Sequence, residues 1–181
     1  LCPHLHLPLQ SGCDRVLKAM NRHYAAAEYR ELVRGIRSRV PDIAVSTDVI
    51  VGFPGETPED FDATLAFIRE MKFARLHVFP YSRRKGTPAA AFAGQINEAE
   101  KKRRVAELQT VAEAAAAEFR GKFLGRELDV LFEGQEAGLV EGLTGNYLRI
   151  FAPGTAENVG GIRRVRLLEP YRDGLRGEIW N

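Results

Sequence analysis

Residues 43–71 read IAVSTDVIVGFPGETPEDFDATLAFIREM, and this stretch decides the fold of the first half of the chain. Its first nine residues, Ile43 to Val51, form an apolar, β-branched run that ends at a glycine, which predicts a strand. A helix is predicted from Pro58 onward, because Thr57 is a favourable N-cap residue and Asp60 places a carboxylate in the first turn. The stretch is therefore predicted to be a strand, a polar loop and a helix.

Similar units lie on either side of this stretch. Apolar runs at Leu5 to Leu9 and Arg75 to Phe79 predict two further strands. The segments Ala25 to Val40 and Pro58 to Met71 predict helices, since their apolar residues recur at helical spacing. Alternating strands and helices indicate parallel strands in an α/β layer.

Three parallel strands alone would leave open sheet edges, whereas parallel sheets are normally covered and flanked by further strands. We therefore expect additional strands before Leu1. The first residue is also Leu rather than Met, so the chain is expected to be a piece of a longer protein.

The sequence changes character after Phe92. Asn97 and Glu100 form a capping-box pair that predicts the start of a long helix. The apolar stripe of this helix consists of Val105, Leu108, Ala112, Ala115 and Phe119. From Arg126 onward, five short alternating runs separated by turn residues predict a small all-β barrel of OB-like or SH3-like topology. The expected domains are residues 1–96, a connecting helix at 97–123 and the β-barrel at 124–181.

Composition excludes several classes of protein. Of the 181 residues, 45% are hydrophobic and 28% charged, and no apolar run approaches the roughly 20 residues that cross a bilayer, which excludes membrane and fibrous classes. With 26 Lys and Arg against 24 Asp and Glu, the formal charge is +2, so affinity for nucleic acid requires a local patch. The two cysteines, Cys2 and Cys13, are too few for a disulfide framework or an iron–sulfur cluster, and no signal-peptide pattern is present. The cytoplasm is the expected location.

Polar or glycine-rich loops follow all three predicted strands. They are residues 10–12 (QSG), 52–57 (GFPGET) and 81–88 (YSRRKGTP). The carboxyl ends of parallel strands form the rim at which α/β proteins bind ligands, so three such loops indicate one shared site. The alternative interpretation is that their glycines only form tight turns.

His4 and His6 lie two positions apart, so they share one face of their predicted strand and could offer two metal ligands. No third ligand is close to them in the sequence, and His77 stands alone. Histidines at strand ends are more often hydrogen-bonded packing residues, so no metal site is predicted.

Two basic runs occur before the β module. Residues 83–85 (RRK) lie on the third loop, and residues 101–104 (KKRR) lie at the start of the predicted long helix. A run of charges on a helix is usually a solvated face, and this is the preferred interpretation of residues 101–104.

The β module groups its basic residues although it is not basic overall. Residues 121–181 carry 8 basic and 9 acidic residues, a net charge of −1, against 18 and 15, a net charge of +3, for residues 1–120. The mixture of arginine and aromatic residues is one that small barrels use to bind RNA. The expected contacts are Arg163, Arg164 and Arg166 on one strand, and Tyr147 and Arg149 alternating with Phe151 on another. An ordinary amphipathic strand with exposed arginines is an equal alternative.

Several motifs together resemble those of a known family. HLPLQSGCDRVLKAMNRHY (6–24), STDVIVGFPGETPEDF (46–61) and FPYSRRKGTPAA (79–90) resemble, in order and spacing, the C-terminal half of the radical S-adenosylmethionine methylthiotransferases. Residues from about 124 to 181 look like the TRAM RNA-binding domain that ends those enzymes. The resemblance implies an α/β fold: the C-terminal half of a partial (β/α) TIM-like barrel, followed by a small OB-like β-barrel.

Within the family, residues 3–22 look most like the branch that modifies threonylcarbamoyladenosine beside the anticodon of tRNA. The branches that act on isopentenyladenosine in tRNA or on an aspartate of a ribosomal protein stay open. A non-catalytic RNA-binding module is the alternative from another functional class. The expected partners are tRNA, through its anticodon stem-loop, and the missing N-terminal half of the enzyme; neither a membrane nor DNA is expected.

The resemblance also implies the cofactors. The family uses a [4Fe–4S] cluster to reduce S-adenosylmethionine to a 5′-deoxyadenosyl radical, and a second cluster and a second S-adenosylmethionine supply the methylthio group. The radical cluster needs a C-x-x-x-C-x-x-C loop, which this sequence lacks, so the chain alone is expected to be inactive.

What the resemblance carries over is one wall of the S-adenosylmethionine pocket. The expected cofactor-binding residues are Gln10, Ser11, Arg22, Val51, Gly52, Phe79 and Tyr81. The first three would bind the ribose and the methionine end, and the other four would contact adenine. The expected substrate-side residues are Arg83, Lys85 and Thr87, which would face RNA phosphates.

Overall fold

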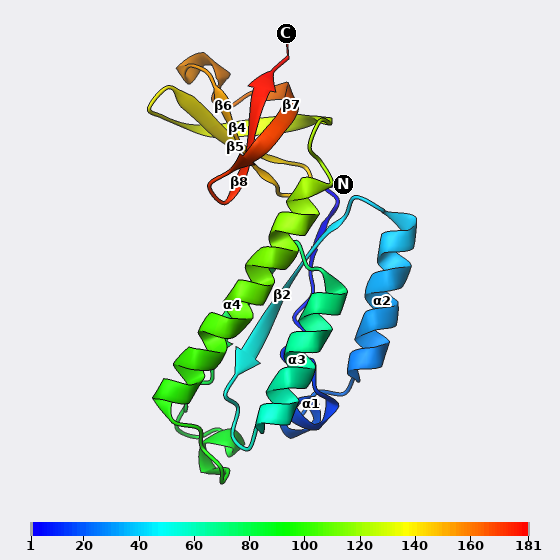
Figure 1. Ribbon diagram of the computed structural model, residues 1–181, viewed down its shortest axis with the longest axis vertical. Coiled ribbons are helices and arrows are strands. Elements are labelled where there is room, and N and C mark those ends of the chain that lie inside the picture. The colour runs from blue at the N-terminus through cyan, green and yellow to red at the C-terminus, as the bar shows by residue number, and fades with distance from the viewer. Residues whose placement is uncertain (1, 181) are drawn as a thin grey trace. The chain divides into compact units, whose positions relative to one another are not determined.

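The computed structural model describes residues 2–180, which divide into two compact units (Figure 1). The α/β unit comprises residues 5–41 and 45–116. The barrel unit comprises the residues up to His4, residues 42–44 and the residues from Ala117 on. No helix among the described residues is long and apolar enough to span a membrane.

A three-stranded parallel sheet belongs to the α/β unit, apart from the first residue of each of its first two strands. Its strands are β1 (His4–His6), β2 (Ala44–Val51) and β3 (Arg75–Pro80), in the order β1-β2-β3. β2 and β3 are parallel, with Asp48 opposite His77, and an isolated parallel bridge joins Gln10 to Val49. The parallel α/β layer predicted from the sequence is confirmed.

The first strand is shorter than predicted. β1 ends at His6, although the apolar run continues to Leu9. Pro8 has no N–H, and the Leu9 N–H donates to the side-chain Oγ1 of Thr47 at 2.9 Å. The regular ladder of the sheet is therefore interrupted after His6.

Three helices lie in the α/β unit: α1 (Asp14–Ala19), α2 (Ala26–Arg39) and α3 (Pro58–Met71). Tyr29 of α2 packs edge-on against Phe67 of α3, with 6.2 Å between ring centres, and its hydroxyl lies 3.4 Å from Thr47 Oγ1 of β2. Thr47 shares a strand face with Val45 and Val49, which are fully buried. Helices α2 and α3 therefore cover this face of β2 (Figure 1).

The N-terminus of α3 forms as the sequence predicts. Thr57 Oγ1 accepts a hydrogen bond from the Asp60 N–H (3.3 Å), and the Asp60 carboxylate accepts one from the Thr57 N–H (2.7 Å). The same carboxylate accepts hydrogen bonds from the Arg15 guanidinium and from Cys13 Sγ (3.1 Å). The hydrogen bond from Arg15 is the main reason why the pKa of Asp60 lies far below its usual range. Asp60 thus joins the first loop of the unit to α3.

The long helix α4 (Glu98–Gly121) follows the 3₁₀ turn η1 (Pro88–Ala91). Asn97 Oδ1 accepts a hydrogen bond from the Glu100 N–H at 2.9 Å, as expected for an N-cap. The predicted apolar stripe is only partly correct, because Val111 is buried and Ala112 half-buried. The buried apolar side of α4 consists of Leu108, Val111, Ala115, Ala116 and Phe119.

The barrel unit contains a closed five-stranded barrel in the order β4-β5-β6-β8-β7. Its strands are β4 (Glu127–Glu136), β5 (Leu139–Thr144), β6 (Arg149–Pro153), β7 (Ile162–Tyr171) and β8 (Gly174–Ile179), with the 3₁₀ turn η2 (Ala156–Asn158) before β7. Only the pairing of β6 with β8 is parallel among the described strands of the barrel. Val130, Phe132, Val165 and Leu167 are fully buried at alternating strand positions. The predicted five-stranded all-β barrel is confirmed.

We expect Asp60→Asn to destabilise the protein by about 1–2 kcal/mol near neutral pH, because it weakens both the cap and the pairing with Arg15. Because the folded-state pKa of Asp60 is lowered, the carboxylate contributes fully above about pH 5. Its contribution declines as the pH falls below the unfolded value of about 4. Urea unfolding of wild type and variant at pH 7 and pH 3 measures the difference, which should shrink by about 1 kcal/mol at pH 3.

Asp62→Asn, at an exposed position of the same helix, is the matched control for the loss of a carboxylate. It should change the free energy of unfolding by less than about 0.5 kcal/mol. An Asp60→Asn effect of equal size at both pH values would contradict the assignment.

Candidate functional site

The rim loops, defined as residues 10–12, 52–57 and 81–88, are held together by backbone hydrogen bonds to β2. The Tyr81 N–H donates to Val51 O (2.8 Å), and the Gln10 N–H donates to Asp48 O (2.8 Å). The Ile50 N–H donates in turn to Gln10 O (2.9 Å). The first and third loops are therefore fixed beside the carboxyl end of β2, where the second loop begins.

A buried ion pair holds the second rim loop against α4. Arg104 Nη1 lies 2.7 Å from Glu56 Oε2, and the two side chains are only 4% and 1% exposed. The same carboxylate oxygen accepts a hydrogen bond from the Gly52 N–H at 2.6 Å. Burial raises the pKa of Glu56, and the bonds from Gly52 and Arg104 oppose that rise. The pair ties the turn after β2 to the first turns of α4.

Gly52 lets α4 approach the loop closely. Its φ is +75°, and a Cβ at this position would lie 2.6 Å from Lys101 Cγ. Lys101 is buried, and its Nζ lies 2.8 Å from Glu98 Oε1. The expectation that residues 101–104 form a solvated face is therefore wrong for Lys101 and Arg104, because both pack against the second rim loop.

Two buried polar atoms of the rim loops, the Tyr81 hydroxyl and Glu56 Oε1, have no hydrogen-bond partner among the described residues. The Tyr81 ring lies edge-on to Phe53, with 5.3 Å between ring centres, and Lys101 Nζ lies 5.4 Å from its centre. A buried polar atom without a partner costs free energy. The Tyr81 hydroxyl, on a half-buried residue, is therefore suited to a polar ligand group at the rim, whereas the Glu56 side chain is only 1% exposed.

An open hollow of about 760 Å³ lies on the third rim loop. It is lined by Arg83, Lys85, Gly86, Thr87, Pro88, Ala90 and Ala91. Arg83 is oriented by a hydrogen bond from its Nε to Ala90 O (2.8 Å). The structure thus brings the three expected substrate-side residues, Arg83, Lys85 and Thr87, to one hollow that carries two cationic groups.

The arginines of β7 do not form one basic stripe. Side chains alternate along a strand, so Arg163 points to the face opposite that of Arg164 and Arg166. Arg164 Nη1 lies 3.1 Å from Asp129 Oδ1, and Arg166 is the register partner of Glu127. Acidic neighbours on β4 thus oppose the two arginines that share a face.

The expectation that Tyr147, Arg149 and Phe151 alternate on one strand is wrong. Tyr147 lies before β6, has a φ of +62° and stacks on His4, with 4.3 Å between ring centres. Phe151 is only 2% exposed. The turn between β5 and β6 is longer than the sequence pattern indicates, so β6 begins at Arg149.

The arginine–aromatic cluster, as we name it, is made up of Arg149, Phe151, Tyr171, Arg172 and Arg176. The guanidinium groups of Arg149 and Arg172 each lie 5.4 Å from the centre of the Phe151 ring, and that of Arg176 lies 5.9 Å from the Tyr171 ring. Sequence reasoning identified Arg149 as a contact but missed Arg172 and Arg176. Their convergence depends on the parallel pairing of β6 with β8, which no local pattern predicts.

Comparisons with known proteins agree with the motifs. Residues 2–68 match the Radical SAM superfamily. The chain is 42% identical over 181 residues to the tRNA-2-methylthio-N(6)-dimethylallyladenosine synthase of Maricaulis maris (strain MCS10). This match covers 99% of this chain and 40% of that protein. It is 40% identical over 179 residues to the threonylcarbamoyladenosine tRNA methylthiotransferase MtaB of Bacillus subtilis (strain 168). This match covers 94% of this chain and 40% of that protein.

The chain is similar to tRNA methylthiotransferases over nearly its whole length, and to the Radical SAM superfamily over residues 2–68. It spans less than half the length of the curated relatives it matches. The chain is also similar to a solved structure, that of the archaeal Methanocaldococcus infernus Elp3 with an N-terminal deletion (1-46). The match covers 93% of this chain and 51% of the Elp3 chain, at 13% sequence identity. Its TM-score is 0.44.

The expected cofactor-binding residues lie at different depths. Gln10, Ser11, Val51 and Gly52 are buried, Tyr81 is half-buried, and Arg22 and Phe79 are exposed. The Ser11 hydroxyl lies 3.2 Å from Thr64 Oγ1, and the Gly52 N–H already donates to Glu56. Arg22, Phe79 and Tyr81 are thus the most accessible of the seven, and the roles of all seven stay predictions.

An iron–sulfur cluster does not fit the two cysteines of this chain. Cys2 is exposed, whereas Cys13 is half-buried and donates a hydrogen bond from its Sγ to Asp60 Oδ1. Burial raises the pKa of the Cys13 thiol, which disfavours the thiolate form that binds iron. Because a [4Fe–4S] cluster is held by several cysteine thiolates, these two residues do not form its site.

We expect Arg104→Met to lower the free energy of unfolding by about 3–5 kcal/mol, because it leaves the buried Glu56 carboxylate without its partner. Arg103→Met is the matched control, since Arg103 lies on the exposed side of the same turn. The control should have a much smaller effect, because the ion pairs of Arg103 are exposed to solvent. Urea unfolding at pH 7 measures both variants, and equal losses would show that the buried pair has no special role.

Proposed function

We propose that this chain is part of an enzyme that attaches a methylthio group to an adenosine of tRNA. The observation that carries the proposal is its identity of about 40%, over nearly its whole length, to proteins named for this reaction. Because the chain spans only 40% of those proteins, the proposal concerns a longer protein of which this chain supplies the rim loops and the β-barrel.

S-adenosylmethionine is the cofactor proposed for the rim loops, because the match to the Radical SAM superfamily includes the first two loops. When bound, it supplies the methyl group and the radical that the family uses. In this chain the exposed Phe79 ring suits the apolar face of adenine, and the exposed Arg22 guanidinium suits a carboxylate. The Tyr81 hydroxyl would gain from the ligand the hydrogen-bond partner it lacks. The ligands of any [4Fe–4S] cluster would come from other parts of the longer protein.

Two surfaces are proposed for tRNA. The hollow on the third rim loop carries Arg83 and Lys85, whose cationic groups suit RNA phosphates. In the barrel, Arg172 and Arg176 of the arginine–aromatic cluster present guanidinium groups, which bind phosphates and stack on unpaired bases. The near-neutral charge of the barrel means that such local groups, not the total charge, would provide the affinity.

We propose threonylcarbamoyladenosine as the substrate, on the resemblance of residues 3–22 to that branch. A relative named for this nucleoside supports the assignment. Isopentenyladenosine, also called dimethylallyladenosine, is the second candidate, because relatives named for it match at 42% and 40% identity. The two candidates share the reaction and differ in the group attached to the adenine amine.

Mass spectrometry of tRNA nucleosides tests both the reaction and the substrate. Cells with and without the gene that encodes this chain are compared for methylthiolated adenosines. Loss of the threonylcarbamoyl form on deletion supports the first substrate, and loss of the isopentenyl form alone assigns the second. Unchanged amounts of both would overturn the proposed function.

Binding of the chain to an anticodon stem-loop RNA should weaken as salt rises from 50 to 200 mM, because phosphate contacts release counterions. The double variant Arg172→Gln, Arg176→Gln should bind more weakly and reduce the slope of log affinity against log salt by about 1 for each lost contact. Fluorescence anisotropy with labelled RNA measures both quantities.

Arg164→Gln is the control for one of the two lost charges. Arg164 Nη1 is hydrogen-bonded to Asp129 at 3.1 Å, whereas the Glu136 carboxylate lies 3.9 Å from Arg172 Nη1. It should leave the slope nearly unchanged. If it instead reduces the slope as much as the double variant does, the β7 strand, and not the arginine–aromatic cluster, contacts the RNA.

A further inference from the structure

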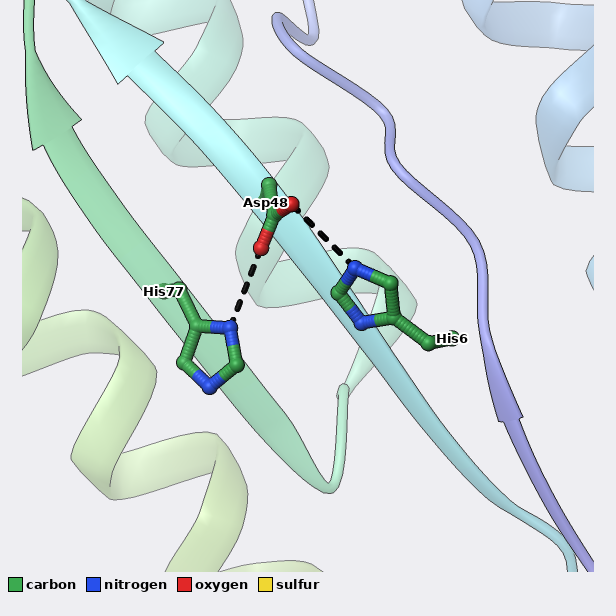
Figure 2. A group of neighbouring side chains, drawn as sticks. All are labelled: His6, Asp48 and His77. Atoms are coloured by element: carbon green, nitrogen blue, oxygen red, sulfur yellow. Dashed lines mark hydrogen bonds and ion pairs between the residues drawn. The ribbon is translucent and has the colours of Figure 1, made fainter.

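Three side chains from three neighbouring strands meet on one face of the parallel sheet. Figure 2 shows His6 of β1, Asp48 of β2 and His77 of β3 pointing toward one another. Asp48 Oδ2 lies 3.2 Å from His6 Nε2, and Asp48 Oδ1 lies 3.0 Å from His77 Nδ1. One ligand atom of each residue lies within 4.8 Å of those of the other two. Of the two histidines that the sequence offered as a metal-binding pair, His4 and His6, only His6 belongs to this group of three.

Ser46 contacts the ring nitrogen of His6 that faces away from Asp48. Ser46 Oγ donates to Leu5 O (3.4 Å) and lies 3.0 Å from His6 Nδ1. With a metal ion bound at His6 Nε2, His6 Nδ1 would carry the proton and donate to Ser46 Oγ. Without the ion, either ring nitrogen can carry the proton, because Ser46 Oγ can donate or accept. The 3.2 Å between His6 Nε2 and Asp48 Oδ2 is close to the separation of two donor atoms that each lie about 2.0 Å from one tetrahedral zinc ion.

The backbone holds the three residues in fixed positions. Asp48 and His77 are register partners in the parallel ladder. On the other side of β2, the Leu7 N–H donates to Ser46 O at 2.9 Å and fixes the strand that carries His6. The side chains of His6, Asp48 and His77 are 38%, 26% and 41% exposed, so an ion can reach them from solvent.

The geometry points to a binding site for a first-row divalent transition metal ion, with zinc as the representative, formed by His6 Nε2, the Asp48 carboxylate and His77 Nδ1. Two imidazole nitrogens and one carboxylate are donors that zinc takes readily, and three protein ligands leave a fourth position for water or a further ligand. Ser46 takes the place of the outer partner that fixes the tautomer of a metal-binding histidine. The site contains no cysteine. The His77 ring packs edge-on against Phe79, with 6.5 Å between ring centres, so the site borders the residues proposed for S-adenosylmethionine. Zinc binding by these three residues does not depend on the proposed function.

Zinc binding to the metal-free 181-residue chain tests the inference, measured by isothermal titration calorimetry with a chromogenic chelator as competitor. We expect one zinc ion per chain at this site. His6→Asn and His77→Asn should each weaken binding by at least about tenfold, and Ser46→Ala should weaken it by about tenfold through loss of the outer contact. Cobalt should replace zinc and give visible d–d absorption that disappears in the same variants.

His23→Asn removes an exposed histidine outside the cluster and is the matched control, and Cys2→Ser excludes binding by the exposed thiol. Both should bind zinc as the wild type does. Circular dichroism establishes that each variant is folded, and Asn at position 77 can still donate a hydrogen bond to Asp48. An absence of zinc binding, or binding unchanged by the His6 and His77 variants, would overturn the inference.

Discussion

The buried ion pair between Glu56 and Arg104 is the interaction on which the candidate site depends. It joins the loop after β2 to the start of α4 where both side chains are shielded from water. An unpaired charge in such surroundings costs several kcal/mol, so the loop and the helix are held together. Because the Gly52 N–H shares the Glu56 carboxylate and Lys101 packs on Gly52, the same contacts fix the backbone at the end of β2.

The parts of the structure that could be predicted from the sequence are those with local causes. Helix α3 runs over Pro58–Met71 as predicted, because Thr57 and Asp60 cap it through hydrogen bonds within four residues. The five barrel strands follow from alternating side chains and from turn residues, which are also local signals. The shape of the rim is different, because it depends on Glu56 and Arg104, which are 48 positions apart. A run of four basic residues gives no indication that two of them are buried.

Side-chain sites that depend on pairing between strands were equally hidden. Asp48 meets His77 because they are register partners, and register is set by the fold as a whole. The arginine–aromatic cluster depends in the same way on the parallel pairing of β6 with β8. Tyr147 illustrates the opposite error. Its alternation with Arg149 and Phe151 predicted one continuous strand, but the backbone turns at Tyr147 and β6 begins only at Arg149.

β2 shows how one strand can serve the core and a polar site together. Val45 and Val49 lie on the face that α2 and α3 cover, whereas Ser46 and Asp48 share the opposite face. Valine at either polar position would suit the strand and bury more apolar surface, by about 25 cal/mol for each Å² removed from water. Packing alone therefore does not account for Ser46 and Asp48. Their hydrogen bonds do: Ser46 pairs with His6, and Asp48 pairs with His6 and His77, so the polar side chains on this face are selected by their partners on the neighbouring strands.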